Sequence, residues 1–108
     1  MAQNRTQPKF ARIWRGRTTR DKADAYEHYW LQVGSAPLIK KGAISVQMLR
    51  EDRAAETEFT TISWWDSIES MAPGGDPYKA HHLPQDKALL IELPERVQIL
   101  RLLDSREA

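Results

Sequence analysis

The stretch Glu56-Thr-Glu-Phe-Thr-Thr-Ile-Ser-Trp-Trp65 decides the fold, because its β-branched and aromatic residues are typical of a β-strand. A charged turn, Glu51–Ala55, precedes this stretch. Before the turn, Ala43–Arg50 carries apolar side chains at every second position, which predicts another strand. Two strands joined by so short a link predict an antiparallel hairpin.

A strand and a helix are predicted on the N-terminal side of this hairpin. Residues Phe10–Arg17 alternate in the manner of a strand. Thr18 or Thr19 then offers an N-cap for a helix that ends at Gly34. The buried stripe of this helix, at steps of three and four residues, consists of Ala23, Tyr26, Trp30 and Val33.

Short helices and a last strand are predicted on the C-terminal side. Acidic caps and prolines indicate helical turns in Ser67–Met71, in Asp76–His82 and within Pro84–Leu93. The aliphatic segment Glu95–Leu103 predicts the fourth strand. The resulting order, β-α-β-β-α-β, is that of an α+β, ferredoxin-like fold with a four-stranded antiparallel sheet.

Both faces of the last predicted strand are apolar. Val97 and Ile99 point to one face, whereas Leu100 and Leu102 point to the other. Helices can bury only one of these faces, and the other would leave a large exposed apolar patch. We therefore expect a second copy of the chain to cover it in a face-to-face homodimer.

Length and composition exclude several classes of protein. The 108 residues suit one domain, which we assign to 10–103, with a flexible lead-in at 1–9 and a tail at 104–108. A net charge of +1 attracts neither nucleic acid nor anionic lipid. No apolar run approaches the roughly 20 residues of a membrane span. Without cysteine, no disulfide or thiol chemistry is expected, and we expect a cytoplasmic protein.

Aromatic side chains are the first candidates for a binding site. The chain has four tryptophans and three tyrosines, more bulk than a small domain needs for packing, and aromatic side chains line ligand pockets. Trp64 and Trp65 are neighbours on a strand, so at most one of them can line a cleft on the helix side. The candidate binding residues are Trp14, Tyr26, Tyr29, Trp30, Trp64 and Trp65.

The adjacent histidines His81 and His82 are the second candidates. A neutral imidazole acts as an acid, a base or a metal ligand. Neighbouring positions of a helix diverge by about 100°, so the pair does not share a metal ion. The third histidine, His28, is on the first helix, and a zinc site needs three or four convergent ligands, so no metal site is expected. The residues alone predict an aromatic cleft with a nearby histidine.

One segment has a recognisable order of motifs. The run Thr61-Ile-Ser-Trp-Trp-Asp-Ser-Ile-Glu-Ser70, followed by Gly75-Asp76, Ala80, Pro84 and Asp86, resembles the antibiotic biosynthesis monooxygenase superfamily. The family pattern is a strand ending in Trp-Asp-Ser, a short helix, a Gly-Asp turn, an alanine-containing helix and Pro-x-Asp. The start of the chain, Trp14-Arg-Gly16 before a tyrosine-rich helix, also fits, and the resemblance covers about residues 10 to 103.

The resemblance implies a dimeric α+β barrel, in which each subunit of a homodimer has one cleft between helices and sheet. Some members oxygenate small aromatic substrates without metal or flavin. Others bind and degrade haem, using an asparagine on the first strand, a tryptophan and a histidine. In this sequence Trp14 or Arg15 stands at the asparagine position, Met71-Ala-Pro73 replaces the tryptophan, and His81 or His82 matches the histidine.

We therefore expect a cofactor-free monooxygenase of a small electron-rich aromatic, such as an anthrone or a quinol. His81 or His82 is the expected general base, and Tyr29 or Trp30 is expected to position the ring. Two alternatives stay open. One is a haem-binding or haem-degrading protein with an axial histidine from the same pair, and the other is a non-catalytic dimeric protein that binds a small ligand.

Overall fold

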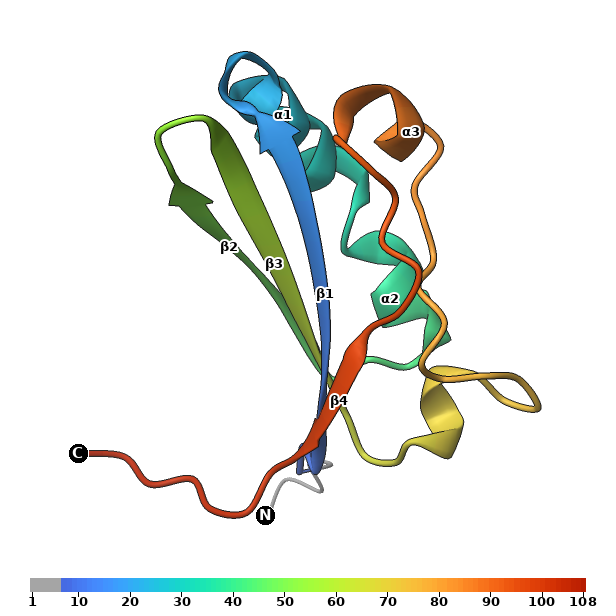
Figure 1. Cartoon of the computed structure of the whole chain (residues 1–108). Coiled ribbons are helices and arrows are strands. Elements are labelled where there is room, and N and C mark those ends of the chain that lie inside the picture. The colour runs from blue at the N-terminus through green and yellow to red at the C-terminus, as the bar shows by residue number, and fades with distance from the viewer. Residues whose placement is uncertain (1–6) are drawn as a thin grey trace.

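The computed structural model describes residues 7–108, in which three helices cover one face of a four-stranded antiparallel sheet (Figure 1). The predicted α+β, ferredoxin-like fold is confirmed, with strands in the order β2-β3-β1-β4. The strands are β1 (Phe10–Thr19), β2 (Ser45–Asp52), β3 (Glu56–Trp65) and β4 (Gln98–Arg101). The helices are α1 (Ala23–Val33), α2 (Ala36–Lys41) and α3 (Asp86–Leu89). The predicted lead-in at 1–9 falls largely outside the described residues.

The central strand pair carries the long register that the sequence predicts. β3 has the predicted bounds and pairs with β1 from Phe10 opposite Trp65 to Thr19 opposite Glu56. Side chains alternate between the faces of the sheet, so every second residue of β3 is buried beneath the helices. These buried residues are Thr57, Phe59, Thr61, Ser63 and Trp65.

The fourth strand is shorter than predicted, because the first half of the predicted segment pairs elsewhere. Val97 N–H donates to the Tyr78 carbonyl at 2.8 Å, and the Glu95 carbonyl accepts from Ala80 N–H at 2.9 Å. Only Gln98–Arg101 pairs with β1. The prediction of a strand over Glu95–Leu103 is therefore correct in place but too long.

The predicted helix over Asp76–His82 is wrong. The Asp76 carboxylate accepts a hydrogen bond from Tyr78 N–H at 2.9 Å, which makes a local turn. The chain then becomes extended, because Lys79 forms a β-bridge with Arg96. The backbone groups of Tyr78 and Ala80 thus pair with the segment before β4, and His81 and His82 lie in a loop outside helices and strands.

A short helix that the sequence analysis did not predict follows α1. α2 has Ser35 at its N-cap position and a proline in its first turn, and it ends at Gly42 with a φ of 116°. This left-handed conformation is easy only for glycine, so Gly42 ends the helix. At the start of α1, a 3-10 turn over Arg20–Lys22 intervenes, and the predicted cap Thr19 makes no capping hydrogen bond.

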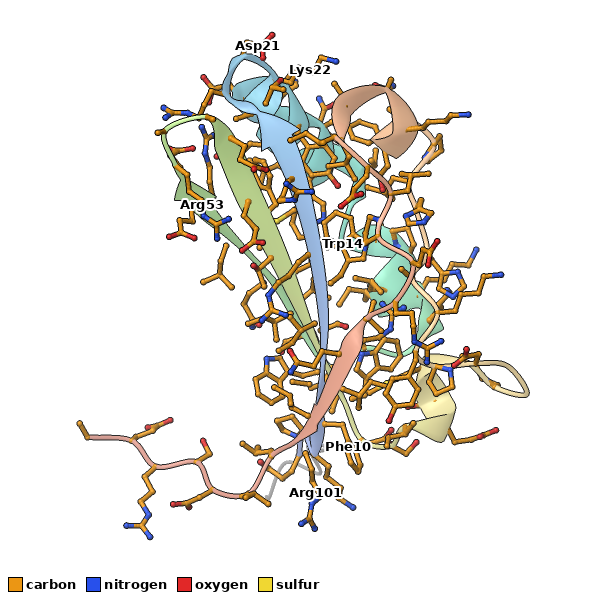
Figure 2. The ribbon with its side chains drawn as sticks, viewed as in Figure 1. Phe10, Trp14, Asp21, Lys22, Arg53 and Arg101 are labelled. Carbon is orange, nitrogen blue, oxygen red and sulfur yellow. The ribbon has the colours of Figure 1, made fainter. Side chains whose placement is uncertain are left out.

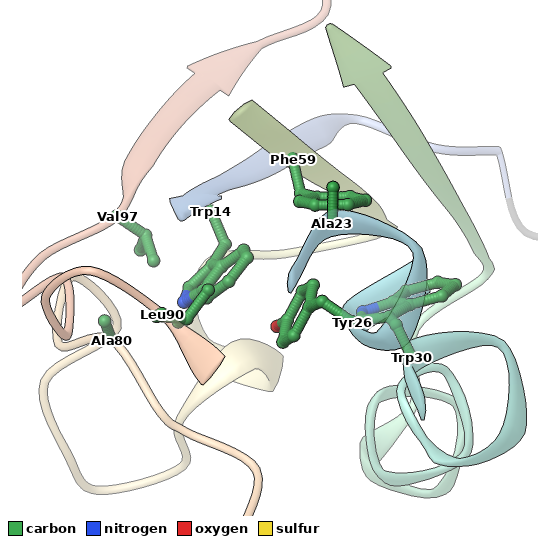
Figure 3. Close-up of a cluster of buried hydrophobic side chains, with 8 residues drawn as sticks. All are labelled: Trp14, Ala23, Tyr26, Trp30, Phe59, Ala80, Leu90 and Val97. Carbon is green, nitrogen blue, oxygen red and sulfur yellow. The ribbon is translucent and has the colours of Figure 1, made fainter. Parts of the chain in front are cut away.

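An aromatic cluster fills the space between sheet and helices (Figure 3). The rings of Tyr26 and Phe59 meet edge to face with their centroids 5.0 Å apart, and Trp14 stacks on Tyr26 at 6.4 Å. Trp14 lies midway along β1, with Phe10 and Arg101 at one end of the sheet and Arg53 at the other (Figure 2). A smaller cluster around Trp65 closes the end near Phe10.

The sheet face opposite the helices carries an open apolar groove. It lies over β1, β3 and β4, and Ile13, Ile62, Trp64 and Leu100 line it. Leu100 is 44% exposed there, and the neighbouring Leu103 is 79% exposed. Within residues 7–108, none of the helices has the length and apolar character that crossing a membrane requires.

Candidate active site

A cavity of about 80 Å³ lies between the helix-facing side of the sheet and the segment that carries the two histidines. Buried side chains from β1 and α1 form its floor, whereas exposed residues from α2 and the histidine segment form its mouth. The lining residues are Arg12, Trp14, Tyr26, Trp30, Gly34, Pro37, Leu38, Thr61, Ser63, His81, His82, Leu83 and Asp86.

Two tryptophans line the cavity, and each packs across a nearby glycine, Gly16 on β1 or Gly34 just after α1. The Trp14 ring covers Gly16, where an added Cβ would stand 2.4 Å from the ring. The Trp30 ring covers Gly34, where an added Cβ would stand 2.5 Å from the ring. Residues two apart on a strand, or four apart on a helix, share a face, so these glycines leave room for the rings.

A buried acid lies beside the aromatic floor. Asp86 is only 1% exposed, and it accepts hydrogen bonds from the Tyr26 hydroxyl at 3.1 Å and from Leu83 N–H at 2.8 Å. Burial raises the pKa of Asp86, and the two hydrogen bonds oppose this effect. Burial and the neighbouring Asp86 also raise the pKa of Tyr26, which therefore stays a proton donor.

A buried cation lies on the sheet side of the cavity. Arg12 is 7% exposed and donates from Nη2 to the Lys79 carbonyl at 2.8 Å and from Nε to the Pro77 carbonyl at 3.4 Å. Burial lowers the pKa of Arg12 from its ordinary value. The guanidinium thus holds the chain just before the two histidines against β1.

The two histidines differ in their surroundings, although both are exposed at the cavity mouth. Burial, followed by the positive charges of Lys41 and Arg12, lowers the pKa of His81. His81 is therefore neutral at neutral pH and able to accept a proton. His82 lies near Asp86 and opposes the effect of burial by lowering the pKa of this carboxyl group. Among residues 7–108, no three histidine, aspartate or glutamate side chains are grouped so that they could hold a metal ion.

The structure brings five of the eight predicted site residues together at this cavity and leaves three outside it. The five are Trp14, Tyr26, Trp30, His81 and His82. Tyr29 instead accepts a hydrogen bond at its hydroxyl from Gln85 N–H at 3.1 Å. Trp65 is buried in the smaller cluster, and Trp64 lies on the opposite face of the sheet.

The charged and hydroxyl residues of the cavity were not among the predicted site residues. Arg12 is two residues before Trp14 and therefore shares its strand face. A charged residue on a face that points to the core is the signal that could have identified Arg12. Asp86 belongs to the Pro-x-Asp motif of the resemblance. Thr61 and Ser63 alternate with Phe59 on β3 and could have been found in the same way.

Comparisons with known proteins bear on the fold. No protein-family model matches the sequence, and no curated protein matches it. A solved structure of a candidate antibiotic biosynthesis monooxygenase from Bacillus cereus superposes with a TM-score of 0.63 at 13% identity, covering 94% of this chain and 100% of that one. The chain therefore has an antibiotic biosynthesis monooxygenase-like fold. At this identity the likeness establishes the fold alone, and the reaction has to be argued from the cavity.

Some members of the superfamily that the sequence resembles bind haem. The cavity of about 80 Å³ is well below the roughly 300–1,000 Å³ of pockets that enclose even drug-sized ligands. Histidines lie at its mouth, but its floor is filled by Trp14 and Tyr26. The residues as placed therefore do not fit a haem group.

Proposed function

We propose that this chain is a cofactor-free monooxygenase that acts on a small, electron-rich aromatic in this cavity. The observation that carries the proposal is the meeting of two tryptophans, Trp14 and Trp30, with two histidine side chains at the mouth of the cavity. The fold likeness supports it, because the Bacillus cereus protein is itself a candidate antibiotic biosynthesis monooxygenase.

The proposed chemistry uses the substrate as its own reductant. A deprotonated quinol gives one electron to O₂, and the ring radical and superoxide combine to form a C–O bond. The peroxide takes up a proton, its O–O bond breaks, and the ring carbon loses its hydrogen as water leaves. One oxygen atom stays on the ring and the other ends in water, so that hydroquinone and O₂ give hydroxybenzoquinone and water.

The protein has two tasks in this scheme. His81 or His82 takes the phenol proton as general base. The lowered pKa of His81 keeps its imidazole neutral at neutral pH, which a general base requires. Trp14, Tyr26 and Trp30 hold the ring, which replaces random encounter by a fixed orientation.

The size of the cavity favours the smaller of the expected substrates. An engineered cavity of about 150 Å³ encloses benzene. The cavity here is about 80 Å³, so a single ring fills it and extends toward the mouth. We therefore propose a single-ring quinol rather than a three-ring anthrone as the better substrate.

The protein acts as a homodimer in this proposal, with the apolar groove on the outer sheet face as the interface. Ile62, Trp64 and Leu100 line this groove on the side of the sheet opposite the cavity. A symmetric pair of sheets buries such a patch without covering either cavity.

Oxygen uptake with a quinol panel tests the proposal. We expect uptake above the rate of spontaneous oxidation, with single-ring quinols preferred over anthrone. Changing the base, His81→Ala or His82→Ala, should lower kcat by about 10²-fold or more for the histidine that serves. His28→Ala is the matched control, because His28 is exposed on α1 and does not line the cavity.

Two results would contradict the proposal. One is the absence of uptake with every quinol and anthrone of the panel. The other is a haemin titration with a histidine-type Soret shift that His81→Ala or His82→Ala abolishes, which would support the haem-binding alternative instead.

A further inference from the structure

We propose that Arg12 binds an oxyanion carried by an aromatic ligand in the cavity. The ligand class is then an aromatic carboxylate or an ionised phenol, and not a neutral ring. As a statement about the substrate, this inference rests on the proposed function. As a statement about binding, it can be tested without any turnover.

The position of Arg12 is unusual for its charge. The residue is 7% exposed, lies on the helix-facing side of β1 opposite Ser63, and lines the cavity. Transfer of a guanidinium from water into the protein is unfavourable unless an opposite charge compensates for it. A buried arginine therefore raises the question of what its counter-charge is.

No carboxylate within residues 7–108 forms a salt bridge with Arg12. The more exposed arginines Arg17, Arg50 and Arg53 each pair with at least two carboxylates. The acid on the cavity, Asp86, is engaged by the Tyr26 hydroxyl and Leu83 N–H instead. The counter-charge of Arg12 is thus absent from the described chain.

The hydrogen bonds of Arg12 leave donors unused. A guanidinium has five N–H groups, and those of Nε and Nη2 reach the Pro77 and Lys79 carbonyls. Nη1 makes no hydrogen bond with the described residues. It is also not one of the fully buried polar atoms that lack a partner, so it remains accessible. The two N–H groups of Nη1 are therefore available to a ligand oxygen.

The surroundings select the rest of the ligand. The other titratable groups on the cavity are His81, His82, Tyr26 and Asp86, and the positive charges of Lys41 and Lys79 act on the same region. This makes the Arg12 side of the cavity positive, while tryptophan rings form its walls. An anion on an aromatic ring satisfies both features.

The test uses 4-nitrophenol, whose yellow anion and colourless neutral form are distinguished by absorbance. With protein in excess, we expect the pKa of bound 4-nitrophenol to fall by about one unit or more, as an opposite charge nearby produces. This corresponds to about tenfold tighter binding of the anion. Arg12→Met should abolish the shift.

Arg15→Met is the matched control. Arg15 lies on the same strand but on the opposite face, where its Nη1 donates to Gln98 Oε1 at 3.1 Å. This variant should keep the full shift of the bound phenol. Retention of the shift by Arg12→Met, or its loss in Arg15→Met, would overturn the proposal.

A second measurement uses the wild-type chain alone and so does not depend on how the variants fold. Calorimetric titration should give at least about tenfold tighter binding of benzoate than of benzamide, its neutral counterpart. If only the phenol shows an anion preference, the oxyanion is a phenolate, and if only benzoate shows it, the oxyanion is a carboxylate. Equal binding of both charge states, or binding of neither probe class, overturns the inference.

These outcomes are separable from those of the proposed function. Anion preference without oxygen uptake supports the Arg12 site and contradicts the monooxygenase. Oxygen uptake without anion preference supports the monooxygenase and contradicts the Arg12 site.

Discussion

Gly16 and Gly34 give the cavity its tryptophan walls, because each lies beneath an indole ring. The Trp14 ring packs against Gly16 on one side and stacks on the Tyr26 ring, so an added methyl group at Gly16 would force the indole to move. We predict that Gly16→Ala and Gly34→Ala each lower the free energy of unfolding by about 1–3 kcal/mol, as expected for an overpacked core. Urea denaturation measures this change.

Gly75→Ala is the control for these two variants. An added Cβ at Gly75 would lie 3.7 Å from its nearest neighbours, which is an ordinary contact. We expect little change in stability there. A loss as large as that of Gly16→Ala would show that any added methyl group destabilises the chain, and would contradict the special role of the two tryptophan-bearing glycines.

Asp86 makes a prediction about pH. Burial raises the pKa of Asp86, so the folded chain binds this proton more tightly than the unfolded chain does. The contribution to stability is present at acid pH and is lost as the pH rises through the folded-state pKa. The variant Asp86→Asn lacks this effect, so wild type should lose stability relative to the variant as the pH rises from about 4, the ordinary pKa of an aspartate, through the raised folded-state pKa.

Urea denaturation of both proteins across that range measures the difference. Comparing them cancels the opposite contributions of other acids, such as Asp52, whose pKa is lowered by its hydrogen bonds with Thr57 and Arg50. A stability difference that does not change with pH would contradict the assignment of Asp86 as a destabilised buried carboxylate.

For individual residues, the sequence predicted the aromatic part of the site better than its charged part. Trp14, Tyr26 and Trp30 follow the periods of a strand and a helix, so their common face is a local property. Arg12 and Lys79 meet although 67 positions separate them, and Tyr26 and Asp86 although 60 separate them. Such partnerships depend on the path of the chain between the elements, which local patterns do not specify.

Among the elements, Arg50 links the β2–β3 hairpin to α1 through ion pairs, in addition to the contact of Phe59 with Tyr26. Arg50 on β2 contacts Asp24 and Glu27 of α1 and Asp52 of its own strand, each at 2.9 Å. Its guanidinium also lies 5.7 Å from the centre of the Phe59 ring. We predict that Arg50→Met lowers the free energy of unfolding by about 1 kcal/mol, and by less at high salt.

Arg53→Met is the control, because the ion pairs of the Arg53 side chain among residues 7–108, with Glu51 and Glu58, stay within the hairpin. Its loss should cost less than that of Arg50. Thermal or urea unfolding at low and high salt makes the comparison. Equal costs for both variants would contradict a role for Arg50 in fastening the hairpin to α1.

Elements were predictable where a local pattern is not in competition with another partner. β3 alternates over its whole length and has the predicted bounds. The segment Asp76–His82 has the cap and proline of a helix start, but the extended segment before β4 pairs with it instead. For α2, the proline in its first turn and Gly42 at its end were present in the sequence as signals.

For the whole molecule, the outer sheet face predicts self-association. We expect sedimentation at micromolar concentration to give about twice the monomer mass of 12.5 kDa. Leu100→Asp places a charge in the apolar groove and should produce monomers. Leu31→Asp is the control, since Leu31 is 66% exposed on α1, away from that face. A wild-type monomer at this concentration would contradict the dimer.

The central claim is that the cavity transfers one oxygen atom from O₂ to an aromatic ring. Mass spectrometry of the product formed under ¹⁸O₂ tests this claim most directly, with catalase present to remove peroxide from spontaneous oxidation. The account predicts a quinone that carries one ¹⁸O atom, formed at a rate that depends on His81 or His82. A product without the label, or labelling that is unchanged when both histidines are replaced, would contradict it.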